Sequence, residues 1–158
     1  MSNYLAIAAV TATLQRILQV AVQEEVYGAR VTTVRPNTLE GGNTETCVNI
    51  YMYMATPNTA HRSTDASSRR PRGELVKRTQ AALDLQYLLS FHGNETELEP
   101  QRLMGCVVRT LQNALVITSE MIRDTLSDPT FTFLAGTDLA DTFEPIFITP
   151  RSEEHTSE

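Results

Sequence analysis

The feature that most constrains the fold is the alternation of apolar and polar side chains in residues 79–93, TQAALDLQYLLSFHG. A helix through Leu85 and Leu89 would place polar side chains on its apolar side, whereas a period of two is that of a half-buried β-strand. At roughly 3.3 Å per residue this strand could reach ~40 Å, well beyond the usual length. The odd positions, predicted to share one face, are Ala81, Leu83, Leu85, Tyr87, Leu89 and Phe91.

A second alternating segment, CVNIYMYMATP, occupies residues 47–57. The tyrosines on its second face indicate that this side is also partly covered. Because the two alternating segments follow each other along the chain, we expect them to pair as an extended hairpin. The pattern assigns Val48, Ile50, Met52 and Met54 to one face and Asn49, Tyr51 and Tyr53 to the other.

Two longer helices are predicted, over residues 2–25 and from Pro100 onward. Ser2 or Asn3 could cap the first helix, and Gly28 would end it. Gly105 costs the second helix up to about 1 kcal/mol, which a close approach to the sheet would explain. The apolar stripe of the first helix is Ile7, Val10, Leu14, Ile17, Leu18 and Ala21, and that of the second is Leu103, Cys106, Val107, Thr110 and Leu111.

Shorter elements fill the rest of the chain. Residues 29–36 read as a short strand closed by Pro36, and Thr118 or Ser119 would cap a short helix that ends at Pro129. Residues 131–136 and 141–149 read as two more strands, the second at a sheet edge or bulged because Pro145 cannot donate a hydrogen bond.

This order of elements predicts an α+β fold with a mostly antiparallel sheet, a long hairpin and helices packed on one face. We expect one domain over residues 1–150. The last eight residues, RSEEHTSE, are polar and aperiodic and resemble translated sequencing-adapter sequence. We interpret 151–158 as a disordered, non-native tail.

Composition narrows the class of protein. The chain has 158 residues, 41% of them hydrophobic, and a net charge of −6, which argues against a dedicated nucleic-acid-binding protein. The N-terminus lacks the pattern of a signal peptide, and we expect no apolar stretch to approach the ~20 residues of a membrane span. We therefore expect a cytoplasmic protein with no membrane or nucleic-acid partner.

The candidate catalytic residues are sparse. Cys47 and Cys106 are best interpreted as small buried hydrophobic side chains. A dyad of Cys47 with His61 or His92 is conceivable, but no local signature supports it. The three histidines lack metal-ligand spacing, and no glycine-rich phosphate loop is present. We expect no enzyme activity, metal or cofactor, and keep a cysteine-dependent hydrolase as an alternative.

Positive charge is concentrated in the polar segment that joins the two long strands. Residues 61–78 contain six of the 13 basic residues and only two acidic ones, a net charge of +4, so the rest of the chain carries −10. The segment could be a docking arm for an acidic surface on a neighbouring subunit, a solvated loop, or a small module that binds phosphate polymers. The basic residues are Arg62, Arg69, Arg70, Arg72, Lys77 and Arg78.

Several segments, taken in order over residues 3–150, resemble the N-terminal domain of the tube-capping, or tail-terminator, protein of extracellular contractile injection systems. These are phage-tail-like particles of the Photorhabdus virulence cassette and antifeeding prophage type. The most specific combination is AALDLQYLLSFHG followed by ELEPQRLMG. The other matching segments are YLAIAAVTATLQRILQ, GARVTTVRP, VNIYMYMATPN and TDLADTFEPIFITP.

The resemblance implies a structural protein with a tail-terminator-like fold, without a catalytic centre. Such proteins are expected to form a homo-hexameric ring that stops polymerisation of the inner tube and joins the tube end to the last sheath ring. The implied partners are further copies of the chain, the inner-tube protein and the sheath protein, first in the cytoplasm and later in the released particle. Members continue with another apolar segment, so we expect this chain to be truncated. Besides the basic arm, the candidate interface residues are Leu83, Leu85, Tyr87, Tyr51 and Tyr53.

Overall fold

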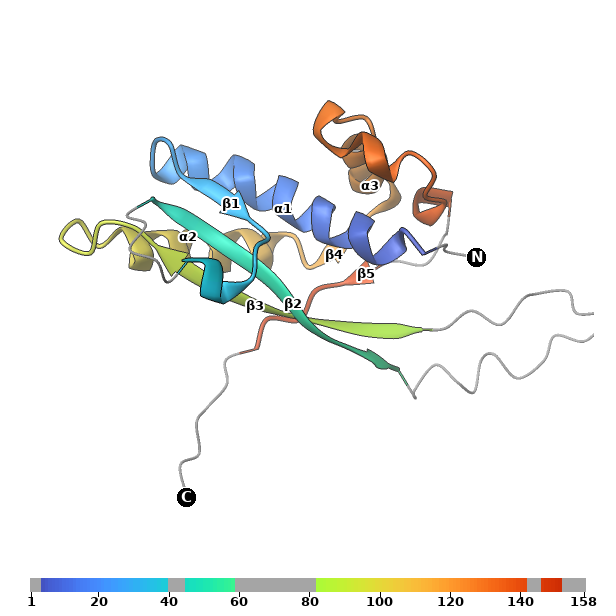
Figure 1. Cartoon of the computed structure of the whole chain (residues 1–158), viewed down its shortest axis with the longest axis horizontal. Coiled ribbons are helices and arrows are strands. Elements are labelled where there is room, and N and C mark those ends of the chain that lie inside the picture. Colours follow the sequence, from blue (N-terminus) through green and yellow to red (C-terminus); the bar gives the residue numbers. More distant parts are fainter. Residues whose placement is uncertain (1–3, 40–44, 59–81, 142–145, 152–158) are drawn as a thin grey trace, which may run out of the picture.

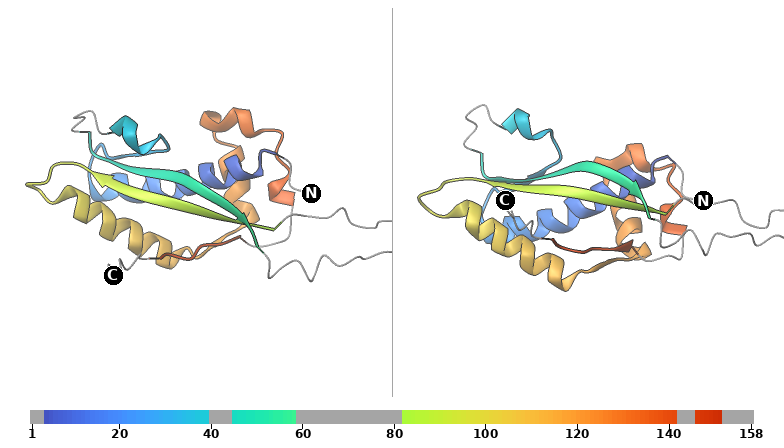
Figure 2. Two further views of the ribbon diagram at one scale, coloured as in Figure 1. Left: turned by 60° about the horizontal axis from the view of Figure 1, so that its bottom comes forward. Right: turned by 90° about the horizontal axis from the view of Figure 1, so that it is seen from below.

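A three-stranded sheet of order β1-β2-β3 forms one layer of the computed structural model, and helices α1 and α2 form the second layer on one face of the sheet (Figures 1 and 2). The structure describes residues 4–39, 45–58, 82–141 and 146–151. Strand β1 is parallel to β2, and β2 is antiparallel to β3. The predicted α+β class is confirmed. The bounds are α1 Ala6–Glu25, β1 Arg30–Thr32, β2 Cys47–Pro57, β3 Leu83–His92 and α2 Glu99–Asn113.

A smaller unit follows α2 in the chain. Strands β4 (Val116–Ile117) and β5 (Ile146–Phe147) form a short antiparallel pair. Between them lies α3 (Ser119–Leu126), and the Thr118 side chain caps it by accepting a hydrogen bond from the Met121 amide. The cap predicted at Thr118 or Ser119 is therefore confirmed at Thr118. Short 3₁₀ helices cover Pro36–Leu39, Pro129–Leu134 and Leu139–Asp141.

Helix α1 supplies much of the core. Its residues Val10, Leu14 and Leu18, all in the predicted stripe, are buried in the same cluster as Val48 of β2. The cluster also includes Val22, which the prediction left out, whereas the stripe residues Ile7, Ile17 and Ala21 are half-buried. By length and composition α1 would also pass as a membrane span, so the expectation that no apolar segment is long enough was wrong. Burial of this stripe in the core accounts for the helix's apolar composition.

The start of α1 differs from the prediction. The N-cap residue is Leu5, and it makes no side-chain cap hydrogen bond. Ser2 and Asn3, the predicted caps, lie outside the described residues. Leu5 itself packs against the core, and this burial replaces the cap as the local constraint. Gly28 adopts φ +82° just after the helix, a conformation that glycine tolerates best.

The predicted hairpin is confirmed. Val48 pairs with Phe91, Ile50 with Leu89, and Met52 with Tyr87. Because directly opposite residues share a face of the sheet, one face of the hairpin joins the core. The odd-numbered residues of β3 that pack against the core are Leu85, Tyr87, Leu89 and Phe91.

A β-bulge between Met52 and Met54 changes the face of the outer part of β2. Met54 pairs with Gln86, and Ala55 pairs with Leu85. Met54 therefore lies on the opposite face from Val48, contrary to the simple alternation, because one extra residue reverses every following side chain.

The turn between β3 and α2 is held by Glu99. Its Oε2 accepts hydrogen bonds from the Asn94 amide at 2.8 Å and the Thr46 hydroxyl at 2.7 Å. A side chain at Gly93 would place its Cβ 2.6 Å from this oxygen. Gly93 is thus required by a close approach, whereas a Cβ at Gly105 of α2 would meet no atom within 4 Å. The expected close approach of Gly105 to the sheet was wrong.

Residues 131–136 do not form the predicted strand. Asp128 accepts a hydrogen bond from the Thr130 amide and Pro129 occupies the first turn, so the segment begins a 3₁₀ helix instead. Phe131 and Leu134, three residues apart, are buried, and Phe133 is 66% exposed. Within the described part of the strand predicted over 141–149, β5 covers Ile146–Phe147, and Pro145 lies outside the described residues.

The two contrasting glycines give a direct test. Replacing Gly93 by alanine should lower the free energy of unfolding by about 1–3 kcal/mol, because Glu99 must move. The matched change Gly105→Ala should raise it by up to about 1 kcal/mol, since alanine is the better helix former and meets no atom. Urea unfolding of both variants measures the difference; equal effects would contradict the contacts described at Gly93.

The hydrogen bond from the Asn94 amide, followed by that from Thr46, lowers the pKa of Glu99 below its ordinary value. A lowered pKa contributes stability that is fully present above the unfolded-state value of about 4.3 and is lost as pH falls through the folded-state value. We predict that Glu99→Gln is less stable than the native chain at pH 7 and loses less stability on acidification. The free energy of unfolding of both proteins is measured between pH 7 and pH 3. If the native chain and Glu99→Gln lose the same stability over this range, the prediction is wrong.

Candidate assembly interface

The two edges of the main sheet differ in how their backbone groups are satisfied. At the β1 edge, the Gln19 side chain accepts a hydrogen bond from the Val31 amide at 2.8 Å and donates one to the Ala29 carbonyl at 3.1 Å. The Gln15 side-chain amide donates to the Val31 carbonyl at 3.0 Å. Two glutamines of α1 therefore occupy the groups with which another strand would pair, and they close this edge.

The β3 edge is open by comparison. Strand β3 pairs with β2 on one side only. Within the described ranges, no hydrogen bond joins its outer backbone groups to another element. About half of the backbone groups of an edge strand point away from its partner and can receive another strand. The main sheet can thus be extended past β3, but not past β1.

The outer part of the hairpin diverges from α1 toward its described end (Figure 1). The first four residues of β2 are buried, whereas Tyr53, Met54 and Ala55 are exposed. The Asn58 amide donates to the Ala82 carbonyl at 2.9 Å and closes the described end of the ribbon. A two-stranded ribbon with apolar side chains on both faces is only marginally stable in water by itself, so this part of the molecule is suited to contact a partner.

One apolar patch lies on the face of the hairpin that turns away from the helices. It comprises Tyr51, which is half-buried, and Tyr53, Met54 and Leu88, which are 45%, 44% and 53% exposed. The Tyr53 hydroxyl donates to the Gln86 side chain at 2.9 Å, which holds its ring on this face. We call these four residues the outer-face patch.

The remaining candidate interface residues lie in two environments. Leu83 is 44% exposed near the end of the ribbon. Leu85 and Tyr87 are half-buried against the core, and the Tyr87 hydroxyl is 2.8 Å from that of Thr11. Burial raises the Tyr87 pKa above its ordinary value, although the Thr11 hydrogen bond opposes the shift. That these three residues contact a neighbouring subunit stays a prediction.

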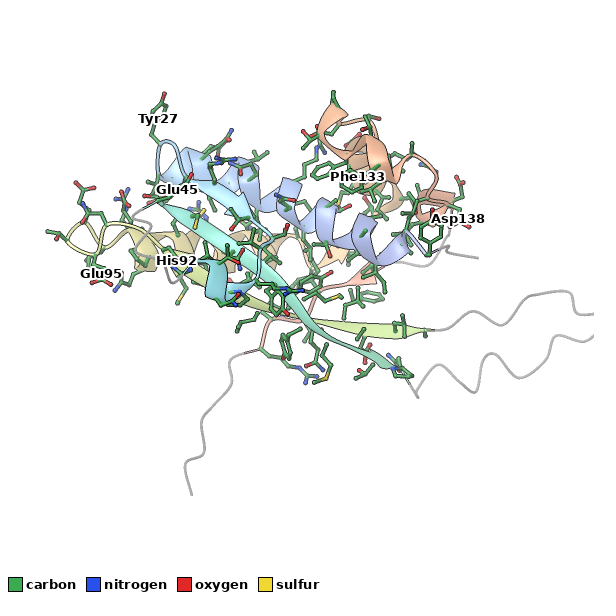
Figure 3. All side chains as sticks on the ribbon, in the orientation of Figure 1. Tyr27, Glu45, His92, Glu95, Phe133 and Asp138 are labelled. Atoms are coloured by element: carbon green, nitrogen blue, oxygen red, sulfur yellow. The ribbon has the colours of Figure 1, made fainter. Side chains whose placement is uncertain are left out.

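The basic residues predicted to form an arm, from Arg62 to Arg78, lie outside the described residues, as does His61. The acidic residues that they could meet are placed at both ends of the domain. Figure 3 shows Glu45 and Glu95 at one end and Asp138 at the other. Further acidic residues near α3 are Glu120, Asp124, Asp128 and Asp141.

Cys47 and His92 are directly opposite each other on β2 and β3. Burial, and then the negative charge of Glu45, raise the Cys47 pKa above its ordinary value, so the thiol stays protonated at neutral pH. The His92 ring is 3.1 Å from the Ser90 hydroxyl. The hollow lined by Leu39, Glu45, Cys47 and His92 has a volume of only about 10 Å³, which is room for about one water molecule.

In the part of the chain that the structure describes, the protonated Cys47 thiol beside His92 lacks the activation that the nucleophile of a cysteine hydrolase needs. Cys47 and Cys106 are buried and form no disulfide. This agrees with their interpretation as small buried hydrophobic side chains. Among the residues that the structure describes, no group of three or more potential ligands could hold a metal ion.

The family model for the Pvc16 N-terminal domain matches residues 9–156. The chain belongs to this family. The match covers most of the sequence and confirms the resemblance to a protein of the Photorhabdus virulence cassette type. It associates this Pvc16 N-terminal domain with contractile injection systems. No curated protein and no solved structure matches the chain.

Sequence reasoning missed the residues that distinguish the two edges of this Pvc16 N-terminal domain. Gln15 and Gln19 are the polar residues that interrupt the apolar pattern of α1 beside its stripe, but only the position of β1 shows what they bind. Leu88 had a detectable signal, since it is a large apolar residue at an even, otherwise polar, position of β3.

The closed edge gives a testable prediction. The double variant Gln15→Ala and Gln19→Ala should lower the free energy of unfolding by about 1–3 kcal/mol, because the backbone groups of Ala29 and Val31 lose their partners. Exposure of a second sheet edge should also increase association of the chain. Urea unfolding and light scattering measure the two effects. Gln112→Ala, an exposed glutamine on α2, is the control and should change neither.

Proposed function

We propose that the chain is a structural assembly protein that caps the inner tube of a phage-tail-like contractile injection particle. In this proposal, six copies form a ring at the tube end, stop tube polymerisation and join the tube to the terminal sheath ring. The observation that carries the proposal is the Pvc16 N-terminal domain match over residues 9–156. The proposed partners are therefore the chain itself, the inner-tube protein and the sheath protein.

The surface of the domain supports this proposal. A cap needs contacts with several neighbours and no catalytic centre, and the hairpin offers the outer-face patch and an open strand edge. Extended edges of this kind recruit other chains through main-chain hydrogen bonds. A ring closes when one head-to-tail contact is repeated by rotation. We propose that the protein has no enzyme activity and binds neither nucleic acid nor a membrane. We also propose that it assembles in the cytoplasm before the particle is released.

The proposal is tested by adding the chain to polymerising inner-tube protein. We expect shorter tubes as the concentration of the chain rises, with a ring of six times 17.6 kDa at the tube end. Electron microscopy measures the tube lengths, and native mass spectrometry measures the mass of the ring released from them. Tube lengths that do not change even with excess chain would contradict the proposed capping function.

The basic arm makes a separate prediction for this assay. Replacing Arg69, Arg70 and Arg72 by alanine should weaken capping, because the arm would lose most of its attraction for an acidic neighbour. The effect should shrink at high salt, where exposed charges are screened. Lysine at the same three positions is the matched control and should keep most of the activity. If the alanine variant caps tubes as well as the native chain, the arm is not a contact.

A further inference from the structure

The open edge of β3 has a sequence that is complementary to itself. Residues 84–92 read DLQYLLSFH, and their polar and apolar positions are symmetric about Leu88. From the open edge and this symmetry we infer that two copies of the chain pair through their β3 strands, antiparallel and centred on Leu88. The inference concerns the free chain and does not rest on the proposed capping function.

The faces of the sheet select this register. Opposite residues of an antiparallel pair lie on the same face, so a register that joins the core faces of both copies must pair odd with odd positions. Centring on Leu88 places Tyr87 opposite the second copy's Leu89, and Leu85 opposite the second copy's Phe91. All four residues pack against the core of their own copy. The two apolar layers would therefore be continuous across the pair.

The outer face is complementary in the same register. Asp84 would lie opposite the second copy's His92, and Gln86 opposite the second copy's Ser90. The carboxylate of Asp84 can accept a hydrogen bond from an imidazole N–H, and the pair occurs twice because of the two-fold symmetry. Leu88, which is 53% exposed in the single chain, would lie directly opposite Leu88 of the second copy. Both side chains would lose part of their contact with water.

The closed β1 edge explains why the association would stop at two copies. Each chain has one open edge in its main sheet, because Gln15 and Gln19 occupy the other. Edge-to-edge pairing of identical open edges uses the same surface on both copies and closes the assembly. A head-to-tail ring instead joins two different surfaces. The pair would therefore cover the exposed edge of β3 in chains that are not yet part of a larger assembly.

The first test is the mass of the chain in solution. Sedimentation should show a concentration-dependent dimer of twice 17.6 kDa. Leu88→Lys should raise the dimer dissociation constant roughly tenfold or more, because two like charges would meet at the symmetry axis. Val20→Lys is the matched control, since Val20 is 55% exposed on α1, and it should leave the dimer intact.

The second test fixes the register. Leu88→Cys should form a disulfide between two copies under mild oxidation, because opposite Cα atoms of paired strands are about 4.5–5.5 Å apart, within disulfide range. Gln86→Cys should not, since its counterpart would lie four residues away along the second strand. Cross-linking at 86 rather than 88, or a dimer that Leu88→Lys leaves unchanged, would overturn the proposal.

A native chain that is monomeric at all concentrations would also overturn the proposed pair. The open β3 edge would then be available to pair with a strand of another protein. A hexamer that Leu88→Lys leaves unchanged would also overturn the β3 pair. That result would support the ring. The tube-length assay does not depend on either result. Failure of the pair and failure of the capping function are thus distinguishable.

Discussion

The packing of the α1 stripe against one face of the β2–β3 hairpin is the contact on which the rest of the structure depends. It buries Val10, Leu14 and Leu18 with Val48 and Ile50 in one cluster, and burial of such side chains is the main favourable contribution to folding. It also fixes which face of the sheet remains outside. The outer-face patch and the closed β1 edge both follow from the position of this helix.

Much of the fold could be predicted because its main elements have strong periodicity. The alternation in 79–93 and 47–57 indicated the two long strands and their pairing, and the stripe of α1 indicated its buried face. Predictions failed where a local interaction was stronger than the pattern. The Asp128 cap and Pro129 start a 3₁₀ helix at a segment that reads as a strand, and the bulge at Met52 and Met54 leaves no mark in the composition.

The candidate interface was less predictable, because exposure and edge status depend on contacts between distant residues. The sequence could identify Tyr51 and Tyr53 as unusual side chains for an outer face, but it could not separate Leu83, which is exposed, from Tyr87, which bonds to Thr11 of α1. The roles of Gln15 and Gln19 depend on where β1 lies. Family membership, in contrast, was recognisable from the order of several segments, since no single residue determines it.

The hydrogen bond between Asn58 and Ala82 at the end of the ribbon has a consequence for how such domains can diversify. Strands β2 and β3 pair in a fixed register up to this bond. That register does not depend on the length of the chain that joins Asn58 to Ala82. Closing a loop of twice the length costs only about 0.6 kcal/mol more. The register of the described ribbon is set by contacts inside it, so domains of this kind could share one register while the chain between these two positions differs in length.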